Sequence, residues 1–284
     1  MTPFVAPVIA SGAITQTVSD TLCQDIGGEI IHRQDDLLVV GTGLSLSRER
    51  LTSLRQALGI DVNQLPVSFE AGRLGLVLSD MDSTFINIEC VDEIADFAGI
   101  KPQVAKITEA AMRGEIDFKT SLTRRVGLLA GLDTSALEKV YRERLRLNPG
   151  AAELVNGLRN DGIPFALVSG GFTFFTERLK QKYRLDFTRS NTLEIIDNKL
   201  TGKLLGDIVD GEAKAAYLEE LCRTLGIECS QTVVMGDGAN DLLMMKKSGL
   251  SVAYRAKPVV QAQATVVLSY SPLNTLLSLF EYSR

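Results

Sequence analysis

Two aspartates, Asp80 and Asp82, stand two positions apart directly after an apolar run. If that run is a strand, both carboxylates leave it into one loop and can face one site at the edge of a sheet. One carboxylate can then act as a nucleophile while the other serves as a general acid and base. The competing interpretation is an ordinary polar turn capped by an aspartate.

Two later groups suit the binding of a phosphate. Ser169 and Gly170 follow a second apolar run and precede a helical segment, where a hydroxyl and backbone N–H groups can meet an anion at a helix N-terminus. Lys214 lies in a helix predicted to begin near Asp210. A capped turn and a solvated surface lysine are the ordinary interpretations of the same residues.

The segment Gly236–Asp241 follows a third apolar run and is rich in glycine. Glycine permits tight backbone geometry, and Asp237 and Asp241 offer hard oxygen ligands. Together with Asp80 they can hold Mg²⁺, which prefers carboxylates, water and phosphate oxygens. The alternative is a glycine-rich turn with an aspartate cap.

Composition excludes several other kinds of site. The chain has 284 residues and a single histidine, His32, so it cannot build a three-histidine or two-histidine zinc site by itself. Enzymes that use a histidine nucleophile with a second histidine are excluded for the same reason. The net charge of −5 argues against a general nucleic-acid binder, which usually carries a basic surplus.

Compartment is predicted from cysteines and from targeting patterns. The four cysteines form no C-x-x-C pair, which favours reduced thiols in a reducing compartment. Residues Met1 to Asp20 contain no Lys or Arg, so they lack the charged start of a signal peptide. No apolar run is long enough for a membrane span. We expect a cytoplasmic protein with no membrane or nucleic-acid partner.

The elements that must position these residues alternate between apolar runs and helical segments. Such alternation predicts an α/β fold, a doubly wound Rossmann-like parallel sheet. The runs expected to be strands are Arg73–Ser79, Ile163–Val168, Thr232–Met235, Leu250–Ala253 and Thr265–Leu268. A hairpin with its turn at Asp197–Lys199 is expected as an addition to this core.

Residues 87–148 are predicted to be a helical cap inserted after the first strand, where it can cover the carboxyl edge of the sheet. The catalytic core then comprises residues 71–86 and 149–284. The cap helices are expected at Glu89–Phe97, Gln103–Arg113, Phe118–Leu129 and Ser135–Leu145.

Residues 1–70 are predicted to be a separate α+β module. Their order of elements is β-α-β-β-α-β, which is typical of ferredoxin-like folds and resembles small regulatory modules of the ACT type. Because ACT-like modules often pair edge to edge, a homodimer is also predicted. The expected elements are Phe4–Ile9, Thr15–Asp25, Glu29–His32, Asp36–Val40, Ser45–Leu58 and Asp61–Val67.

Taken in their order along the chain, the four groups described above (Asp80 with Asp82, Ser169 with Gly170, Lys214, and Gly236–Asp241) resemble the sequence signature of the haloacid dehalogenase superfamily. The cap strengthens this and resembles the phosphoserine phosphatase family in the segments Ile88–Ala95, Ile107–Gly114, Asp117–Phe118 and Ser121–Val126. The resemblance covers about residues 74–280. It implies Mg²⁺-dependent hydrolysis of O-phosphoserine through an aspartyl-phosphate, the last step of serine biosynthesis.

The resemblance also implies a role for each site residue. Asp80 is the expected nucleophile and Asp82 the expected acid and base. The groups expected to contact the phosphoryl oxygens or their surroundings are Ser169, Gly170, Lys214 and Asn240. The expected metal ligands are Asp80, the backbone carbonyl of Asp82, Asp237 and Asp241. In the cap, Glu89 is expected to face the substrate ammonium, Arg125 its carboxylate, and Met112 and Phe118 to wall the pocket.

Two alternatives remain open from the sequence. The same fold can hydrolyse a different phosphomonoester or transfer the phosphoryl group to a second amino-alcohol. A different class of function is a sensor in which residues 1–70 bind an amino acid and the core is inactive. The complete set of Asp80, Asp82, Lys214 and Asp237 argues against a decayed core.

Overall fold

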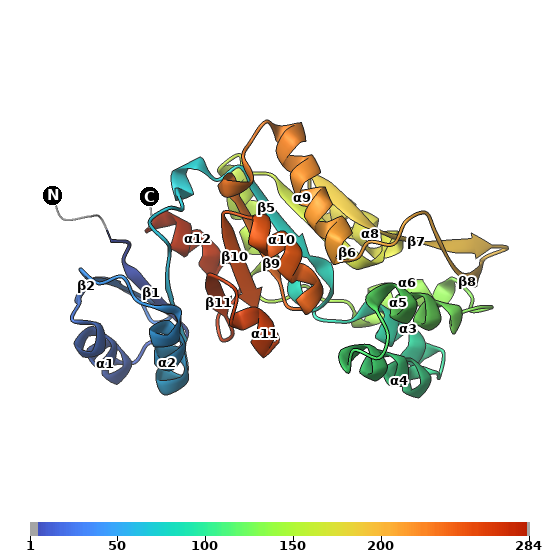
Figure 1. Cartoon of the computed structure of the whole chain (residues 1–284), viewed down its shortest axis with the longest axis horizontal. Helices are drawn as coiled ribbons and strands as arrows, with labels where there is room; N and C mark the ends of the chain where they lie inside the picture. The colour runs from blue at the N-terminus through green and yellow to red at the C-terminus, as the bar shows by residue number, and fades with distance from the viewer. Residues whose placement is uncertain (1–4, 283–284) are drawn as a thin grey trace.

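Two β-sheets organise the chain in the computed structural model, which describes residues 5–282. A four-stranded antiparallel sheet lies near the N-terminus and a seven-stranded sheet forms the centre of the molecule (Figure 1). A group of helices lies at the opposite end from the N-terminal sheet (Figure 1). The predicted fold class, a mainly parallel α/β core with an N-terminal α+β module, is therefore confirmed.

The N-terminal module has the predicted order of elements. Its strands are arranged β2-β3-β1-β4, the arrangement of a ferredoxin-like sheet. Thr15 caps the first helix by accepting a hydrogen bond from Val18 N, and Ser47 caps the second in the same way. The elements are β1 (Val8–Ser11), α1 (Gln16–Ile26), β2 (Glu29–Arg33), β3 (Leu37–Gly41), α2 (Arg48–Leu58) and β4 (Asp61–Gln64). The first strand starts later than predicted, and Phe4 lies outside the described residues.

The central sheet has the order β11-β10-β9-β5-β6-β7-β8, parallel except for β8. Its strands are β5 (Leu76–Asp80), β6 (Phe165–Phe172), β7 (Phe187–Ile196), β8 (Lys199–Leu205), β9 (Thr232–Gly236), β10 (Leu250–Tyr254) and β11 (Val266–Leu268). All five predicted strands are present, and β7 adds a sixth parallel one. Because β5 lies between β6 and β9, the chain runs outward in both directions from it, and such a point opens a crevice at the carboxyl ends of the strands.

Helices cover both faces of this sheet, as apolar residues at successive positions of its strands require. In β5, Val77 packs in one apolar cluster while Leu76 and Leu78 pack in the cluster on the other face. The helices α7 (Ala151–Asn160), α8 (Thr173–Tyr183) and α12 (Thr275–Glu281) contribute to the first cluster. The helices α9 (Gly211–Leu225), α10 (Leu242–Lys247) and α11 (Pro258–Gln261) contribute to the second.

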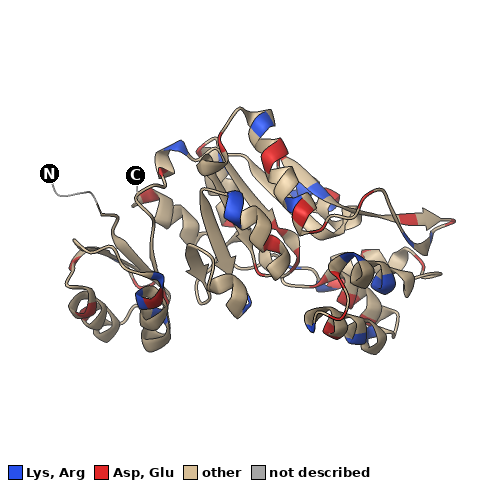
Figure 2. Cartoon of the chain, in the orientation of Figure 1, with Lys and Arg blue, Asp and Glu red and all other residues tan. Residues whose placement is uncertain are grey.

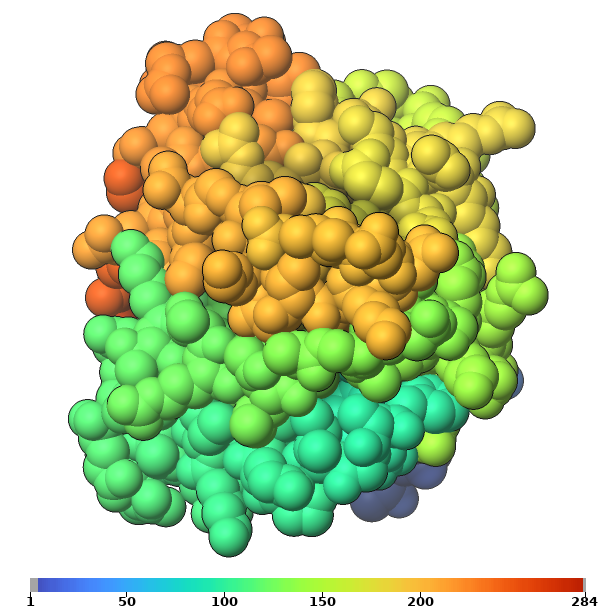
Figure 3. Space-filling model, turned by 90° about the vertical axis from the view of Figure 1, so that its right-hand side faces the viewer, coloured from blue at the N-terminus to red at the C-terminus, as the bar shows by residue number. Residues whose placement is uncertain are grey.

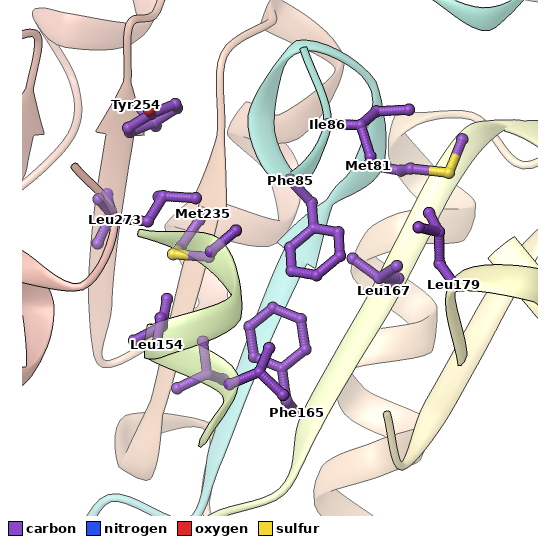
Figure 4. Close-up of a cluster of buried hydrophobic side chains, with 14 of the residues drawn as sticks. Met81, Phe85, Ile86, Leu154, Phe165, Leu167, Leu179, Met235, Tyr254 and Leu273 are labelled. Atoms are coloured by element: carbon purple, nitrogen blue, oxygen red, sulfur yellow. The ribbon is translucent and has the colours of Figure 1, made fainter. Parts of the chain in front are cut away.

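Buried aromatic and aliphatic side chains anchor the loop that follows β5. Met81, Phe85 and Ile86 are fully buried, and the rings of Phe85 and Phe165 lie 5.4 Å apart (Figure 4). In the close-up, Phe85 lies beside Phe165 and Leu167, which are both side chains of β6. A densely packed base of this kind resists displacement, so the polar residues between its anchors are held in place.

The cap consists of α3 (Cys90–Phe97), α4 (Lys101–Met112), α5 (Phe118–Gly127) and α6 (Ser135–Lys139), followed by a wider turn at Val140–Arg144. The hairpin β7–β8 extends from the core to the cap. Leu200 accepts a hydrogen bond from Gly131 N at 2.8 Å and donates to the carbonyl of Leu132 at 2.9 Å. The space-filling view shows hairpin and cap as one continuous face (Figure 3), so the cap is supported from the core side.

Charged residues of both signs are interleaved along the helices of core and cap (Figure 2). Among residues 5–282, none of the helices combines the length and the apolar content that crossing a bilayer requires.

The module is attached to the core by buried hydrogen bonds from β4 to β11 and the turn after it. Asp61 is 0% exposed, and its carboxylate accepts from Ser269 N, Tyr270 N and Ser271 N at 2.8, 3.0 and 2.8 Å. The side-chain amide of Asn63 exchanges two hydrogen bonds with the backbone of Val267. The edge strand β4 of the module sheet is therefore bonded to the core through its side chains and does not face solvent.

Replacing Asp61 by alanine is expected to lower the free energy of unfolding by about 2–4 kcal/mol, because three backbone N–H groups, one of them fully buried, would lose their acceptor. Urea unfolding of the full chain measures this change. The matched control is Asp35→Ala, which alters an exposed aspartate of the same module and should stay within about 0.5 kcal/mol of the unmodified chain. Equal stability of both variants would show that Asp61 does not hold the two parts together.

Candidate active site

An acidic cluster lies where β5 and β9 end. Asp80 is the last residue of β5, and Asp237 directly follows the last residue of β9. Lys214, from the first turns of α9, lies 2.9 Å from Asp80 Oδ1 and 2.7 Å from Asp241 Oδ1. Lys214 and Asp241 are 0% exposed, so this ammonium is not a solvated surface charge. The structure thus joins three of the four predicted groups at one point.

Carboxylate oxygens of Asp80, Asp237 and Asp241 all lie within 4.8 Å of one another. Burial and the charge of Asp241 raise the pKa of Asp80 well above its usual range, although Lys214 opposes the shift. The same two causes raise the pKa of Asp237 to about 6. The three carboxylates gather around Lys214, with Lys257 as a further positive neighbour of Asp237, and this set of hard oxygen donors suits a divalent cation such as Mg²⁺.

The glycine before Asp237 is required by the approach of Asp241. A Cβ atom on Gly236 would lie 2.3 Å from Asp241 Oδ2. That oxygen also accepts from the backbone N–H groups of Asp237 and Gly238 at 3.2 and 3.1 Å. Asp241 therefore holds both Lys214 and the Asp237 loop, in addition to being a candidate metal ligand.

Asp82 has a distinct environment from Asp80. Its Oδ2 accepts a long hydrogen bond from Cys90 N at 3.4 Å, while its Oδ1 is buried and has no hydrogen-bond partner among the described residues. Burial and the charge of Glu89 raise the pKa of Asp82 to about 8. Asp82 is therefore largely protonated at neutral pH, and its unpartnered oxygen can exchange a proton with a bound molecule.

Asn148 fixes the loop between Asp82 and the cap, and the sequence analysis did not identify it. Its amide donates to the carbonyls of Ser83, Thr84 and Ile86 at 3.2, 2.9 and 3.0 Å. Ser83 has a φ of 57°, an uncommon value for a residue with a side chain. Its hydroxyl donates to Glu89 at 2.7 Å and thereby orients that carboxylate.

The Ser169 segment stands between a strand and a helix, as predicted. The strand is longer than predicted, because β6 continues to Phe172, and α8, the predicted helical segment, begins at Thr173. The pairing of β6 with β7 is interrupted between Val168 and Phe172, which opens the backbone there. Ser169 Oγ accepts from Gly171 N at 2.8 Å, so its hydroxyl hydrogen remains available to a ligand.

Asn191, on β7, is a second residue that the sequence analysis missed. Its amide donates to the carbonyl of Gly170 and accepts from Val209 N, both at 2.8 Å. Because Val209 leads into α9, Asn191 ties the Ser169–Gly171 segment to the helix that carries Lys214. An isolated asparagine in a strand has no sequence signal for such a role.

The cap brings Phe118 over the core. A Cβ atom on Gly170 would lie 2.9 Å from the ring of Phe118, so only glycine permits this approach. Met112, in contrast, is 72% exposed, and the structure does not bury it in a pocket wall. The side-chain oxygen of Asn240 would lie 2.4 Å from a Cβ on Gly238, which places Asn240 beside the Asp237 loop.

Arg125 faces a group of acids between cap and core. Its Nε is buried without a hydrogen-bond partner among the described residues. Burial lowers the pKa of Arg125, although the charges of Asp92, Glu89 and Asp82 oppose the shift. A buried guanidinium nitrogen without a partner is costly, so Arg125 and Asp82 both offer unused hydrogen-bonding capacity to a bound molecule.

A family model for haloacid dehalogenase-like hydrolases matches residues 74–249. A phosphoserine phosphatase of Polaromonas sp. strain JS666 is 54% identical to the chain over 226 residues, which span 78% of this chain and 96% of the relative. This similarity covers most of the residues that build the acidic cluster and the cap.

Two solved structures are similar to the whole chain or to most of it. A probable phosphoserine phosphatase from Vibrio cholerae, in unliganded form, is 36% identical with a TM-score of 0.85, and the match covers 100% of this chain and 90% of that one. A phospho-aspartyl intermediate analogue of phosphoserine phosphatase is 40% identical with a TM-score of 0.68, and covers 72% of this chain and 98% of its own.

Proposed function

The chain belongs to the phosphoserine phosphatase family of haloacid dehalogenase-like hydrolases, and we propose that it hydrolyses O-phosphoserine through a phosphorylated Asp80 with Mg²⁺ as cofactor. The observation that carries the proposal is the contact of Lys214 with Asp80 at 2.9 Å, beside a buried Asp82 two residues later that has an oxygen without a hydrogen-bond partner among the described residues. The two carboxyl groups are close in sequence, yet they have different neighbours and can take different tasks.

In the first step a carboxylate oxygen of Asp80 attacks phosphorus. Lys214 and the N–H of Met81 both donate to Asp80 Oδ1, which leaves Oδ2 as the attacking oxygen. The serine oxygen leaves with the proton of Asp82, because a carboxyl group with a pKa of about 8 still holds that proton at neutral pH. Ser169 and Lys214 supply donors for the phosphoryl oxygens.

In the second step Asp82 acts as a base. Having lost its proton, it accepts one from water, which attacks the phosphorus of the acyl phosphate on Asp80. The Asp80 carboxylate is released and phosphate leaves. Lys214 stays between Asp80 and Asp241 and stabilises negative charge through both steps.

Recognition of the amino acid is assigned to the cap. Arg125 presents a forked guanidinium that matches a planar carboxylate, and its buried Nε needs such a partner. Glu89, oriented by Ser83, is the proposed partner of the ammonium. Phe118 closes the pocket over Gly170, whereas Met112 would have to move inward to take the role that the resemblance implies.

The acid role of Asp82 predicts a pH dependence. For an alkyl phosphate without an ammonium group, such as glycerol phosphate, we expect kcat/KM to fall as pH rises through about 8, because the acid form of Asp82 is then lost. Glu89→Gln removes a negative neighbour and should move this fall to lower pH. Glu143→Gln changes an exposed cap residue and is the matched control. An unchanged profile in Glu89→Gln would contradict the assignment of the titrating group.

The donor set of Asp80, Asp237 and Asp241 fits Mg²⁺, which when bound would polarise the phosphoryl oxygens and offset charge on the attacking carboxylate. We expect a chelator to stop turnover and Mg²⁺ to restore it, while Ca²⁺ inhibits. Mg²⁺ should also raise the midpoint temperature of thermal unfolding, since it binds only the folded chain. The increase should be smaller in Asp237→Asn. It should be unchanged in the control Asp207→Asn, which alters an exposed residue. Full activity without metal would exclude the cofactor.

One assay separates the proposal from its rivals. Release of phosphate from O-phosphoserine with Mg²⁺ is measured alone and with candidate amino-alcohol acceptors. Hydrolysis that acceptors do not divert supports a phosphatase, whereas a phosphorylated acceptor would favour a transferase. Absence of turnover with any phosphomonoester would favour a sensor that binds its ligand in residues 1–70.

We also propose that the chain is divided into an N-terminal module of residues 1–70, a core of residues 71–86 and 149–284, and a cap of residues 87–148.

Strand β2 is the outer strand of the module sheet and exposes Ile30 and Ile31, at 46% and 61%. A second copy pairing on this edge would give a homodimer, which sedimentation analysis of the full chain and of Ile31→Lys tests. The free state of all four cysteines is consistent with the cytoplasm.

A further inference from the structure

Two thiols lie side by side in the core, on the side opposite the acidic cluster. Cys222 is in the last turns of α9, and Cys229 lies just before β9. Cys229 Sγ donates a hydrogen bond to Cys222 Sγ at 3.2 Å. In the described part of the chain this is the one contact between thiols, and the proposed reaction uses neither group.

The backbone on both sides of this pair is held in place. The carbonyl of Cys222 accepts from Ile227 N at 3.0 Å, where Gly226 ends the helix. The carbonyl of Cys229 accepts from Gly249 N at 2.9 Å and from the hydroxyl of Thr232 at 2.7 Å. A disulfide bond is about 2.05 Å long, so its formation requires the two sulfur atoms to move closer from 3.2 Å. Because the backbone is held in place, this movement falls to the two side chains.

The two thiols differ in their exposure to solvent. Cys222 is 4% exposed, and burial together with the adjacent Cys229 raises its pKa to about 12. Cys229 is only partly buried, so a small oxidant in solution reaches it first. Such an asymmetric pair resembles the arrangement in which an accessible thiol is oxidised and a neighbouring thiol resolves the product.

We propose that Cys222 and Cys229 form a reversible dithiol–disulfide couple that hydroperoxides oxidise. The sulfur of Cys229 attacks the outer peroxide oxygen, the O–O bond breaks, and the thiol proton leaves with the alcohol or water that forms. Cys229 is then a sulfenic acid. The sulfur of Cys222 attacks it, the S–O bond breaks, and the hydroxyl leaves as water with the proton of Cys222. Two thiols thus lose two electrons while one peroxide is reduced.

The disulfide would tie the end of α9 to the start of β9. The opposite ends of these two elements carry Lys214 and Asp237, so the bond would join the elements that position the acidic cluster without touching it. The other two cysteines serve as internal controls. Among residues 5–282, Cys23 is partly exposed and has no thiol neighbour, and Cys90 is buried at the base of the cap.

The experiment treats the full, reduced chain with hydrogen peroxide and counts thiols after denaturation with a chromogenic disulfide reagent. A mild treatment is expected to reduce the count from four to two, and dithiothreitol should restore it. Peptide mass spectrometry should find Cys222 joined to Cys229 within one chain, with the loss of two hydrogen atoms. Cys23→Ser, the matched control, should form the same joined peptide.

Variants of the pair make the order of events testable. In Cys222→Ser the sulfenic acid at Cys229 should persist and react with dimedone, whereas the unmodified chain should give little adduct because Cys222 consumes it. Cys229→Ser should form neither adduct nor disulfide. A dimedone adduct of equal yield in the unmodified chain and in Cys222→Ser would overturn the proposal. So would a joined peptide that links two different chains.

Discussion

Asp80→Asn is expected to lower turnover of O-phosphoserine by at least about 10⁴-fold, because an amide is a poor nucleophile and a poor metal ligand. The fold should persist, since Lys214 keeps its contact with Asp241 at 2.7 Å. The raised pKa of Asp80 shows that its ionised form is disfavoured in the metal-free cluster. We therefore expect the thermal midpoint of Asp80→Asn without metal to equal or exceed that of the unmodified chain.

Steady-state kinetics and thermal unfolding of the same samples measure both quantities. Asp197→Asn is the matched control, because Asp197 is exposed at the tip of the β7–β8 hairpin and its φ of 49° suits asparagine. Undiminished phosphatase activity in Asp80→Asn would exclude the mechanism.

Asp82→Asn separates the two steps. With an activated substrate, whose leaving group needs no proton, the phosphorylated chain should form and then hydrolyse slowly. Intact-mass measurement should detect the added phosphoryl group on Asp80. Rapid hydrolysis with no accumulation would show that Asp82 is not the base of the second step.

Arg125→Ala is expected to lower kcat/KM for O-phosphoserine by an amount on the order of 2–4 kcal/mol, or about 30- to 1,000-fold. The loss should appear mainly in KM if the guanidinium holds the substrate carboxylate in both ground and transition states. Arg125→Lys should also be impaired, because a point charge cannot reproduce the fork. p-Nitrophenyl phosphate has no carboxylate and should be affected much less.

The decisive quantity is the ratio of kcat/KM for the two substrates. Arg124→Ala removes the preceding, exposed arginine of the same helix and should leave this ratio unchanged. Glu89→Ala should change it in the same direction as Arg125→Ala. Equal losses for both substrates in Arg125→Ala would replace amino-acid recognition with a general structural role in the cap.

Local patterns were sufficient for most elements of the fold, although not for the parallel strand β7. The apolar runs that became β5, β9, β10 and β11 are buried on both faces, and such strands require continuous apolar sequence. The N-terminal helices lie close to their predicted ranges, because Thr15, Ser47 and the glycines after each helix act as caps through their immediate neighbours. The predicted strand before Ser169 ended too early, because a strand that continues through two glycines has no local signal that separates it from a turn.

The order of the four motifs along the chain was also sufficient to assign the chemistry, because three of them stand at the same edge of one parallel sheet and the fourth, Lys214, lies in the helix α9. Only the tertiary structure shows the surroundings of the two carboxyl groups. Asp80 and Asp82 are chemically alike and two positions apart, but Lys214 and Asp241 lie beside Asp80 while Glu89 lies near Asp82, and these neighbours come from elsewhere in the chain. The same holds for Asn148, for the Asp61 contact and for the Cys222–Cys229 pair. Each of these contacts joins segments that are distant along the chain, and the packing of the whole fold brings them together, which a local sequence pattern does not show.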